Sequence, residues 1–215
     1  MTITVFGASG HVGKHVVNLA LGKGYTVKAF GRNIDAFLDL EERDTNFHAL
    51  QGYIFNDEEV LDAVKGSDAV ISTLGGAFDG SDKTRSLGIK HIITAMDKAG
   101  AKRIVALGGL GVLNETENAI IMDNKDYPQE FLPVGREHLQ AYKFLAASDL
   151  DWTFVCSPDI VEAPLTGSYT TLADYAPEGA MGKKISSADI ALFMVSELTK
   201  KEYVKKRVGI SPKTA

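Results

Sequence analysis

Short apolar runs alternate with longer amphipathic segments along most of the chain. The apolar runs are continuous and rich in β-branched residues, as expected of strands that are buried on both faces. They predict strands at Thr2–Phe6, Thr26–Phe30, Phe47–Gln51, Ala69–Thr73, Arg103–Leu107 and Trp152–Cys156. The segments between them predict helices at Gly10–Gly22, Asn33–Glu42, Asp57–Val64, Thr84–Lys98 and Arg136–Ala147.

This alternation of strands and helices is typical of βαβ units joined by right-handed crossovers. It predicts an α/β fold of the Rossmann type, with a doubly wound parallel sheet between two layers of helices in a three-layer αβα sandwich. No repeat or linker divides the sequence, so residues 1–215 are expected to form a single domain.

Two parts of the chain depart from the alternation. The segment Gly108–Pro133 lacks periodicity and is too long for a routine connector, which predicts either a functional flap or a poorly ordered loop. After Cys156, the pattern predicts a short strand at Ser168–Leu172, a helix at Ser187–Thr199 and a last strand near Val208. We expect residues 157–215 to form a small cap over the carboxyl edge of the sheet, where open α/β sheets bind ligands.

Composition narrows the class of protein. With 45% hydrophobic and 24% charged residues, the chain is typical of a globular protein. A net charge of -5 argues against broad nucleic-acid affinity, and one cysteine cannot form an internal disulfide. No apolar run approaches the roughly 18–20 residues that span a bilayer, and the sequence opens directly into a strand pattern. We expect a cytoplasmic protein that binds neither nucleic acid nor membrane.

A glycine-rich turn joins the first strand to the first helix. Its sequence is Gly7-Ala8-Ser9-Gly10-His11-Val12-Gly13. Gly7 permits a tight turn, Gly10 leaves room for a pyrophosphate, and Gly13 allows close packing of helix on sheet. Free N–H groups at the start of the helix would hold the phosphates. The turn predicts a dinucleotide site formed by residues 7–12; the alternative is a glycine turn with no ligand.

The end of the second strand suggests which dinucleotide binds. NAD-selective sites usually carry an acidic residue about 20 residues beyond the glycines. Here Arg32 stands 19 residues after Gly13 (32 − 13), followed by Asn33. A guanidinium attracts a 2′-phosphate, so we expect Arg32 and Asn33 to favour NADP(H), with NAD(H) still possible. The alternative is an exposed arginine at the start of a helix.

The fourth strand ends in Ser72-Thr73-Leu74-Gly75. Small residues at the carboxyl end of a strand let a ribose and a diphosphate lie against the backbone. We therefore expect these four residues to contact the cofactor, although a plain strand exit would have the same sequence.

These motifs resemble the atypical short-chain dehydrogenase family. Ser148–Thr153 adds to the likeness, and the tail, Ser157–Ile160 followed by Pro164–Thr170, resembles the flavin reductase and biliverdin reductase B branch. The resemblance implies a domain that binds NADP(H) and passes a hydride to a flavin or another flat conjugated acceptor. The flavin would be a substrate and not a tightly held cofactor. It also implies that His138 and Pro158 contact the cofactor.

Three positions depart from that branch. Gly108-Gly109 replaces a serine after the fifth strand, and Asp159 replaces a histidine after the proline of the tail motif. Both changes remove polar groups expected near a bound tetrapyrrole or flavin. Tyr53 replaces an acidic residue after the third strand, which affects only the adenine end of the site.

The sequence offers few acid–base candidates. None of its seven tyrosines is followed four residues later by lysine, so the Tyr-x-x-x-Lys pair that donates a proton to carbonyls is absent. His138, on the same helix face as Tyr142, is one catalytic candidate. Asp159 is the other, if burial raises its pKa. Packing roles are the alternatives, and hydride transfer to a flavin can proceed without a protein acid.

The remaining reactive side chains suggest no further chemistry. His15, His48 and His91 show no metal-ligand spacing, so no metal site is expected, and Cys156 fits a buried hydrophobe. The leading hypothesis is an NAD(P)H-dependent reductase of a flavin- or quinone-like small molecule, acting as a monomer or small homo-oligomer. A non-catalytic NADP(H) sensor like the NmrA-type regulators is the alternative, and a subunit whose loops bind a partner is a third.

Overall fold

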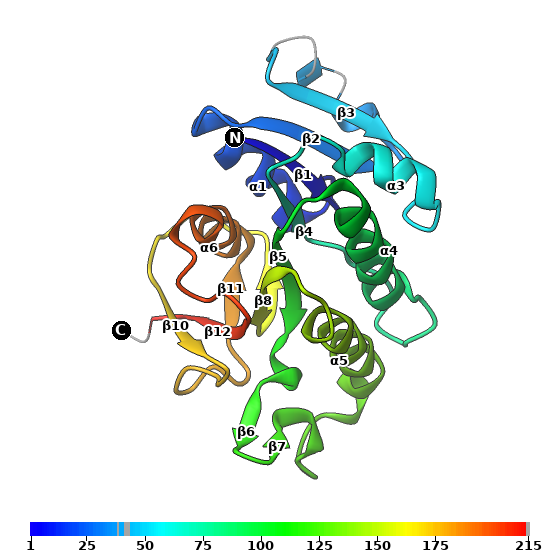
Figure 1. Cartoon of the computed structure of the whole chain (residues 1–215). Helices are drawn as coiled ribbons and strands as arrows, with labels where there is room; N and C mark the ends of the chain where they lie inside the picture. The colour runs from blue at the N-terminus through cyan, green and yellow to red at the C-terminus, as the bar shows by residue number, and fades with distance from the viewer. Residues whose placement is uncertain (38, 41–43, 214–215) are drawn as a thin grey trace.

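A mostly parallel sheet of eight strands runs through the computed structural model, which describes residues 1–37, 39–40 and 44–213 (Figure 1). The strands are β1 (Thr2–Phe6), β2 (Thr26–Gly31), β3 (Phe47–Gln51), β4 (Ala69–Ser72), β5 (Arg103–Gly109), β8 (Asp151–Ser157), β10 (Tyr169–Ala173) and β12 (Lys206–Pro212). Their order is β10-β12-β8-β5-β4-β1-β2-β3, and only β10 runs antiparallel to its neighbour.

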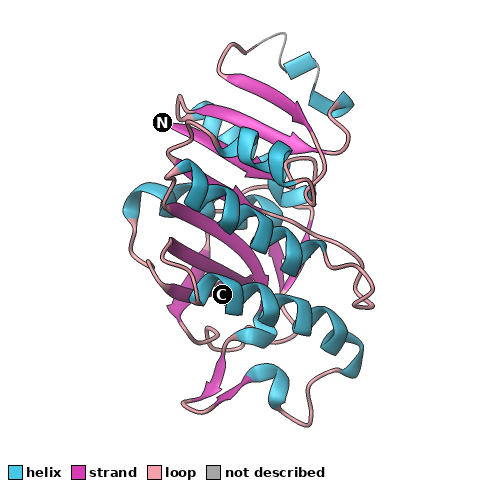
Figure 2. Ribbon diagram, turned by 45° about the vertical axis from the view of Figure 1, so that its right-hand side comes forward, coloured by secondary structure: helices cyan, strands magenta, loops and turns pink. Residues whose placement is uncertain are grey.

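Helices cover both faces of this sheet (Figure 2). On one face, α1 (His11–Gly22) and α6 (Ser187–Lys200) contribute to one apolar core. On the other, α3 (Asp57–Val64), α4 (Thr84–Ala99) and α5 (Leu132–Ala146) contribute to a second. The predicted Rossmann-type α/β sandwich is therefore confirmed.

The predicted elements agree closely with the structure, with two differences among the helices. The six strands predicted before the tail begin and end within two residues of those observed. The helix expected from residue 136 begins at Leu132, because Pro133 fits the first turn, where its missing N–H costs nothing. The helix expected at Asn33–Glu42 lies partly outside the described residues, and its described part contains a short 3-10 turn, η1 (Asp35–Phe37).

The segment Gly108–Pro133 folds into short regular elements, which argues against a poorly ordered loop, one of the two alternatives that the sequence left open. It contains a small hairpin and three 3-10 turns, namely η2 (Leu110–Val112), β6 (Asn114–Thr116), β7 (Ala119–Ile120), η3 (Ile121–Asp123) and η4 (Gln129–Phe131). Val112 and Leu113 are fully buried, and Arg207 donates hydrogen bonds to the Val112 carbonyl and to Asn114 Oδ1. Periodicity is absent because the buried side chains come from turns and not from one regular element.

Of residues 157–215, expected to form a cap, the structure describes 157–213, and these form more than a cap. β9 (Asp159–Val161) and β11 (Lys184–Ser186) pair in a separate small sheet, and Asp159 and Ile160 line the cavity described below. In contrast, β10 and β12 extend the main sheet and α6 packs beside α1. The buried Asp189 of α6 accepts hydrogen bonds from the Thr166 hydroxyl and from two backbone N–H groups, so the Thr166-Gly167 turn of the tail motif is anchored to the body of the protein.

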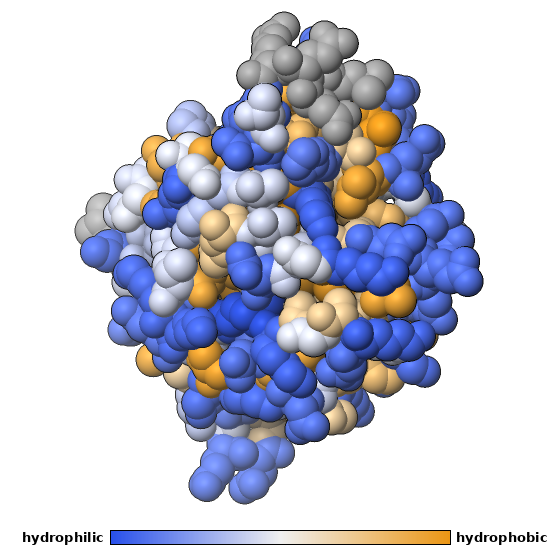
Figure 3. All heavy atoms as spheres, turned by 45° about the horizontal axis from the view of Figure 1, so that its top comes forward, coloured by the Kyte–Doolittle hydropathy of each residue, from blue (hydrophilic) through white to orange (hydrophobic). Residues whose placement is uncertain are grey.

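Hydrophilic residues cover most of the face seen in Figure 3, and apolar residues form scattered small patches there. Tyr53, Phe78 and Met181 are large apolar side chains that are at least half exposed, and all three line the cavity described below. In the described part of the chain, no helix has the length and apolar character needed to cross a bilayer.

A buried ion pair connects α6 to the sheet. Arg103 Nη2 lies 3.0 Å from Glu197 Oε1, with side-chain exposures of only 5% and 1%. Arg103 Nη1 also donates to the Asp151 carbonyl and to Thr153 Oγ1, at 2.8 and 2.9 Å. A buried pair of this kind makes each partner depend on the other for compensation of its charge.

We expect Glu197→Ala to lower the free energy of unfolding by about 3–5 kcal/mol, because it leaves the Arg103 guanidinium buried without its contacting counter-charge. Urea-induced unfolding measures the change. Asp62→Ala is the control: it removes an exposed pair with Lys65 and should cost less than about 1 kcal/mol. A loss below about 1 kcal/mol for Glu197→Ala would contradict the expectation.

Candidate functional site

A cavity of about 1020 Å³ opens at the carboxyl ends of β1, β2, β4, β5 and β8. It is lined at one end by the glycine turn, the end of β2 and the loop after β3, and at the other by residues from α4, α5, the segment after β5 and β9. It contains the crevice where the strand order reverses about β1, the place where doubly wound sheets bind ligands.

The glycine turn is held tightly against the neighbouring strand. Gly7 has a φ of 79°, and its carbonyl accepts hydrogen bonds from Gly10 N and Thr73 Oγ1, both at 3.0 Å. A Cβ on Gly13 would lie 2.2 Å from that carbonyl oxygen. The packing agrees with the roles expected of these glycines. Gly7 makes the turn, and Gly13 lets α1 pack closely against that turn.

The N-terminus of α1 faces the cavity, and its first N–H groups have no hydrogen-bond partner among the residues that the structure describes. Its N-cap, Gly10, supplies no side-chain hydrogen bond, and its first turn contains no acidic residue. By contrast, α3 is capped by the Asn56 side chain and starts with three acidic residues. Because the helix dipole places partial positive charge at such an end, α1 fits an anion such as the diphosphate of a dinucleotide.

Arg32 lies exposed at the mouth of the cavity, where β2 ends. Among the described residues, no carboxylate comes within 4.0 Å of its guanidinium. Its carbonyl accepts a hydrogen bond from Gln51 Nε2 at 3.1 Å, which ties the end of β2 to the end of β3. The backbone of Arg32 is thus held in place, while its exposed guanidinium is available to a phosphate.

Most of the residues expected at the cofactor site meet at this cavity. Those that line it are Gly7, Ser9, Gly10, His11, Val12, Arg32, Thr73, Leu74, Gly75, His138 and Pro158. Three do not line it: Ala8 and Ser72 are buried beneath it, and the Asn33 side chain accepts a hydrogen bond from Asp35 N at 2.8 Å. For these three, a contact with the cofactor stays a prediction.

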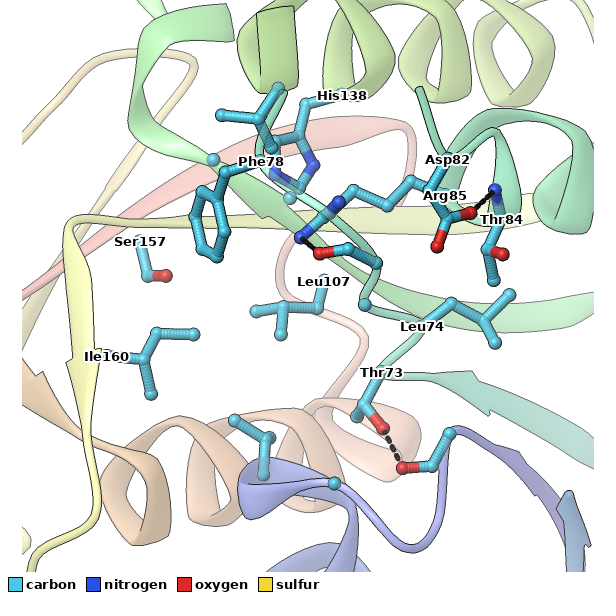
Figure 4. A pocket seen from close by; sticks show the side chains of 18 of the residues that line it. Thr73, Leu74, Phe78, Asp82, Thr84, Arg85, Leu107, His138, Ser157 and Ile160 are labelled. Atoms are coloured by element: carbon cyan, nitrogen blue, oxygen red, sulfur yellow. Dashed lines mark hydrogen bonds between the residues drawn. The ribbon is translucent and has the colours of Figure 1, made fainter. Parts of the chain in front are cut away.

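His138 lines the far end of the cavity, in the space beside β5 (Figure 4). A Cβ on Gly109 would lie 2.8 Å from Cδ2 of its ring, so the glycine that replaces the expected serine makes room for this imidazole. Its Nδ1 is buried and has no hydrogen-bond partner in the described part of the chain. Burial, and to a lesser extent the positive charge of Arg85, lower the pKa of His138 to about 3. At neutral pH the ring is therefore uncharged, so it can form hydrogen bonds but is not an imidazolium acid.

Arg85, on the first turn of α4, is a cavity residue that the sequence analysis missed. Its side chain is buried, with residue exposure of 7%, and Nη1 and Nη2 donate to the Ala77 and Gly76 carbonyls, both at 2.9 Å. The guanidinium carbon lies 5.3 Å from the centre of the Phe78 ring. No motif marks this residue, because only the packing of α4 on the loop before it turns the side chain inward.

The other catalytic candidates are placed less favourably. Asp159 lines the cavity but is exposed, so the burial on which its proposed proton-donor role depended is missing. Tyr142 faces the core, with its ring 5.8 Å from Trp152 and 6.3 Å from Phe154, and does not share the cavity with His138. Tyr127 does line the cavity; burial and the nearby charge of Asp159 raise its pKa, so it stays a neutral phenol.

We expect the His138 imidazole to stay neutral between pH 8 and pH 5, because its pKa in the folded protein is about 3. The ring nitrogen chemical shifts, followed by NMR across this range, measure its protonation. The unfolded chain in urea is the control, where the ring should titrate near its ordinary value of about 6.5. Between these two pKa values only the unfolded chain binds the proton, and this binding favours unfolding. The contribution of His138 to the free energy of unfolding is therefore largest above about pH 6.5 and declines as the pH falls toward 3. A folded-state midpoint above about pH 5 would contradict the expectation.

Comparisons with known proteins agree with this geometry. The model of the NAD(P)H-binding family matches residues 7–201. The uncharacterized protein YwnB of Bacillus subtilis is 30% identical over 98% of each chain. A solved structure from Streptococcus pneumoniae, described as a candidate NADH-flavin reductase, is 26% identical with a TM-score of 0.82 and covers 99% of this chain and 100% of its own.

A candidate epimerase from Bacteroides thetaiotaomicron is 28% identical with a TM-score of 0.85, and the match covers 100% of this chain and 98% of the other. The relatives therefore share the fold over nearly their whole length, while the activities in their names differ. The match over the glycine turn, the strand ends and the tail shows that this chain belongs to the NAD(P)H-binding family, within the atypical short-chain dehydrogenases.

Proposed function

We propose that this protein is an NADP(H)-preferring reductase of flat conjugated molecules, such as flavins or quinones. The observation that carries the proposal is the continuity of the cavity. One end presents a free helix N-terminus and an exposed arginine, and the other is walled by aromatic and apolar side chains. Such a cavity is suited to hold an anionic dinucleotide and a flat acceptor end to end.

Different residues of the chain would bind different parts of the dinucleotide. The first N–H groups of α1 would bind the diphosphate, and Arg32 would bind the 2′-phosphate. Leu74 and Gly75 would support the ribose and nicotinamide at the end of β4. When bound, the dihydronicotinamide supplies the hydride, and the protein supplies orientation and the exclusion of water.

The lack of a protein acid favours conjugated acceptors over isolated carbonyls. His138 is neutral, Asp159 is exposed, and no Tyr-x-x-x-Lys pair exists in the sequence. A flavin or quinone can spread the electrons it receives over its rings and take its proton from water afterwards, whereas an isolated carbonyl needs a proton as it is reduced. The neighbour described as an NADH-flavin reductase supports the same choice.

The same lack of an acid also favours a second candidate, a non-catalytic protein that senses the NADP(H) redox state. Such a protein would need the dinucleotide end of the cavity and no hydride acceptor. The two candidates therefore differ in what the far end of the cavity does.

Turnover distinguishes these candidates. We expect the protein to oxidise NADPH in the presence of excess riboflavin or a soluble quinone, at a rate clearly above the reaction in free solution. The loss of dihydronicotinamide absorbance measures it, and heat-denatured protein is the control. Tight NADPH binding without turnover for any flavin or quinone would replace the reductase with the sensor.

We expect Arg32→Ala to weaken the binding of NADPH by about 10- to 100-fold, because a charge-assisted contact with the 2′-phosphate is lost. NADH, which lacks that phosphate, should bind with nearly unchanged affinity and is the internal control. Calorimetric titration of both nucleotides measures the change. An unchanged ratio of the two affinities would remove Arg32 from the site.

A further inference from the structure

The far end of the cavity contains a buried positive charge whose role the binding of a dinucleotide does not explain. The Arg85 guanidinium lies in the cavity wall, next to Phe78 and close to the imidazole of His138 (Figure 4). We infer that Arg85 binds an oxygen of the acceptor, the one that becomes negatively charged on reduction. This inference rests on the proposed reductase function and names the chemistry of its acceptor.

The first argument is the balance of charge. Of the carboxylates that the structure describes, none lies within 4.0 Å of the Arg85 guanidinium. The carboxylates of Asp82 and Glu137 attract the guanidinium from further away, but both already accept hydrogen bonds from other groups. Glu137 accepts from Lys83 Nζ at 2.7 Å and from Ser86 Oγ at 2.6 Å, and Asp82 accepts from Thr84 N at 2.7 Å.

A buried cation without a contacting anion is costly, because two carbonyl hydrogen bonds replace only part of the water that it has lost. Desolvation accordingly lowers the pKa of Arg85, although an arginine stays charged. A guanidinium has five N–H donors, and Arg85 uses one nitrogen for the Gly76 carbonyl and another for the Ala77 carbonyl. These bonds fix its orientation and leave donors for a ligand.

The second argument comes from His138. The ring lines the same end of the cavity. Its Nδ1 has no hydrogen-bond partner among the described residues, but it is buried away from the cavity, so a ligand there would meet the ring through its other atoms. Because the ring is neutral, it does not compete with Arg85 for an anion.

The surrounding surface defines the rest of the ligand. Apart from Asp82 and Thr84 beside Arg85, the cavity walls at this end are mostly apolar or aromatic and include Phe78, Leu110, Tyr127, Phe131 and Val134. A matching acceptor has a flat apolar body with an oxygen at one edge. Quinones and flavins have this form, and a compact aliphatic substrate does not.

The chemistry places negative charge where Arg85 could stabilise it. An acceptor of this class gains one proton and two electrons as a hydride, while the nicotinamide is oxidised and gains one positive charge. The reduced acceptor then has one negative charge, which lies on an oxygen in a quinone until water supplies a second proton. A fixed cation beside that oxygen stabilises the charge as it develops.

Binding of two naphthoquinones tests the inference without turnover. Lawsone is a hydroxynaphthoquinone that is an anion at neutral pH, and menadione is a neutral naphthoquinone of similar size. Both are titrated into the protein by calorimetry with saturating NADP⁺, which blocks the cofactor end and cannot reduce them. We expect wild-type protein to bind lawsone at least about tenfold more tightly than menadione.

Substitutions then assign that preference to one residue. Arg85→Gln should bring the ratio of the two affinities close to one, and Arg85→Lys should keep part of it because the charge remains. Arg136→Gln, which removes an exposed cation from α5 outside the cavity, is the matched control and should keep the full ratio. A substitution that only loosened the loop would weaken both ligands equally and leave the ratio unchanged.

An unchanged ratio in folded Arg85→Gln, or no preference for lawsone in the wild type, would overturn the inference. Circular dichroism establishes that the variant is folded. Should it not fold, Arg85→Lys gives the answer: lysine cannot keep both carbonyl bonds and still present an N–H group to the ligand as the guanidinium does, so the ratio must fall, and a ratio equal to that of the wild type would contradict the inference. Failure of the proposed function gives a different result: no turnover with any acceptor, whatever the binding ratio.

Discussion

The contact between the glycine turn and strand β4 determines where everything else in the site lies. Gly13 lies so close to the Gly7 carbonyl that any side chain there would overlap it, and Thr73 donates a hydrogen bond to the same carbonyl. These contacts fix the start of α1 against the ends of β1 and β4. The helix can then present its free N–H groups to the cavity, because no side chain caps them. The proposed cofactor end of the site is therefore a consequence of backbone packing more than of particular polar side chains.

Electrostatics distinguishes the two ends of the cavity. Its mouth has an exposed arginine, Arg32, whose charge is well hydrated until a ligand arrives. Its far end has a desolvated arginine, Arg85, and an imidazole kept neutral by burial. Both ends favour anions, although the whole chain has a net charge of -5. In a cavity, the local field depends on the nearby fixed groups and on the loss of water, so the net charge of the protein says little about its ligand.

Buried acidic residues connect separate elements of the molecule. Asp189 anchors the Thr166-Gly167 turn, Glu197 neutralises Arg103 at the base of the sheet, and Glu137 joins α5 to the start of α4. The first of these gives the Thr166-Gly167 part of the tail motif a structural role. Its threonine and glycine fit a carboxylate that accepts two backbone N–H groups and a hydroxyl, a structural demand with no direct part in the chemistry.

The sequence by itself determined the strands, most of the helices and the dinucleotide end of the cavity. Those features depend on local patterns: continuous apolar runs, the spacing of Gly7, Gly10 and Gly13, and an arginine at a strand end. The sequence did not predict the structure of Gly108–Pro133, whose buried side chains follow no period. It also did not predict the exposure of Asp159. Only the tertiary structure brought Arg85 and His138 together and separated His138 from Tyr142. The pKa of a histidine and the orientation of an arginine depend on the packing of segments far apart in the chain, and no local pattern records that packing.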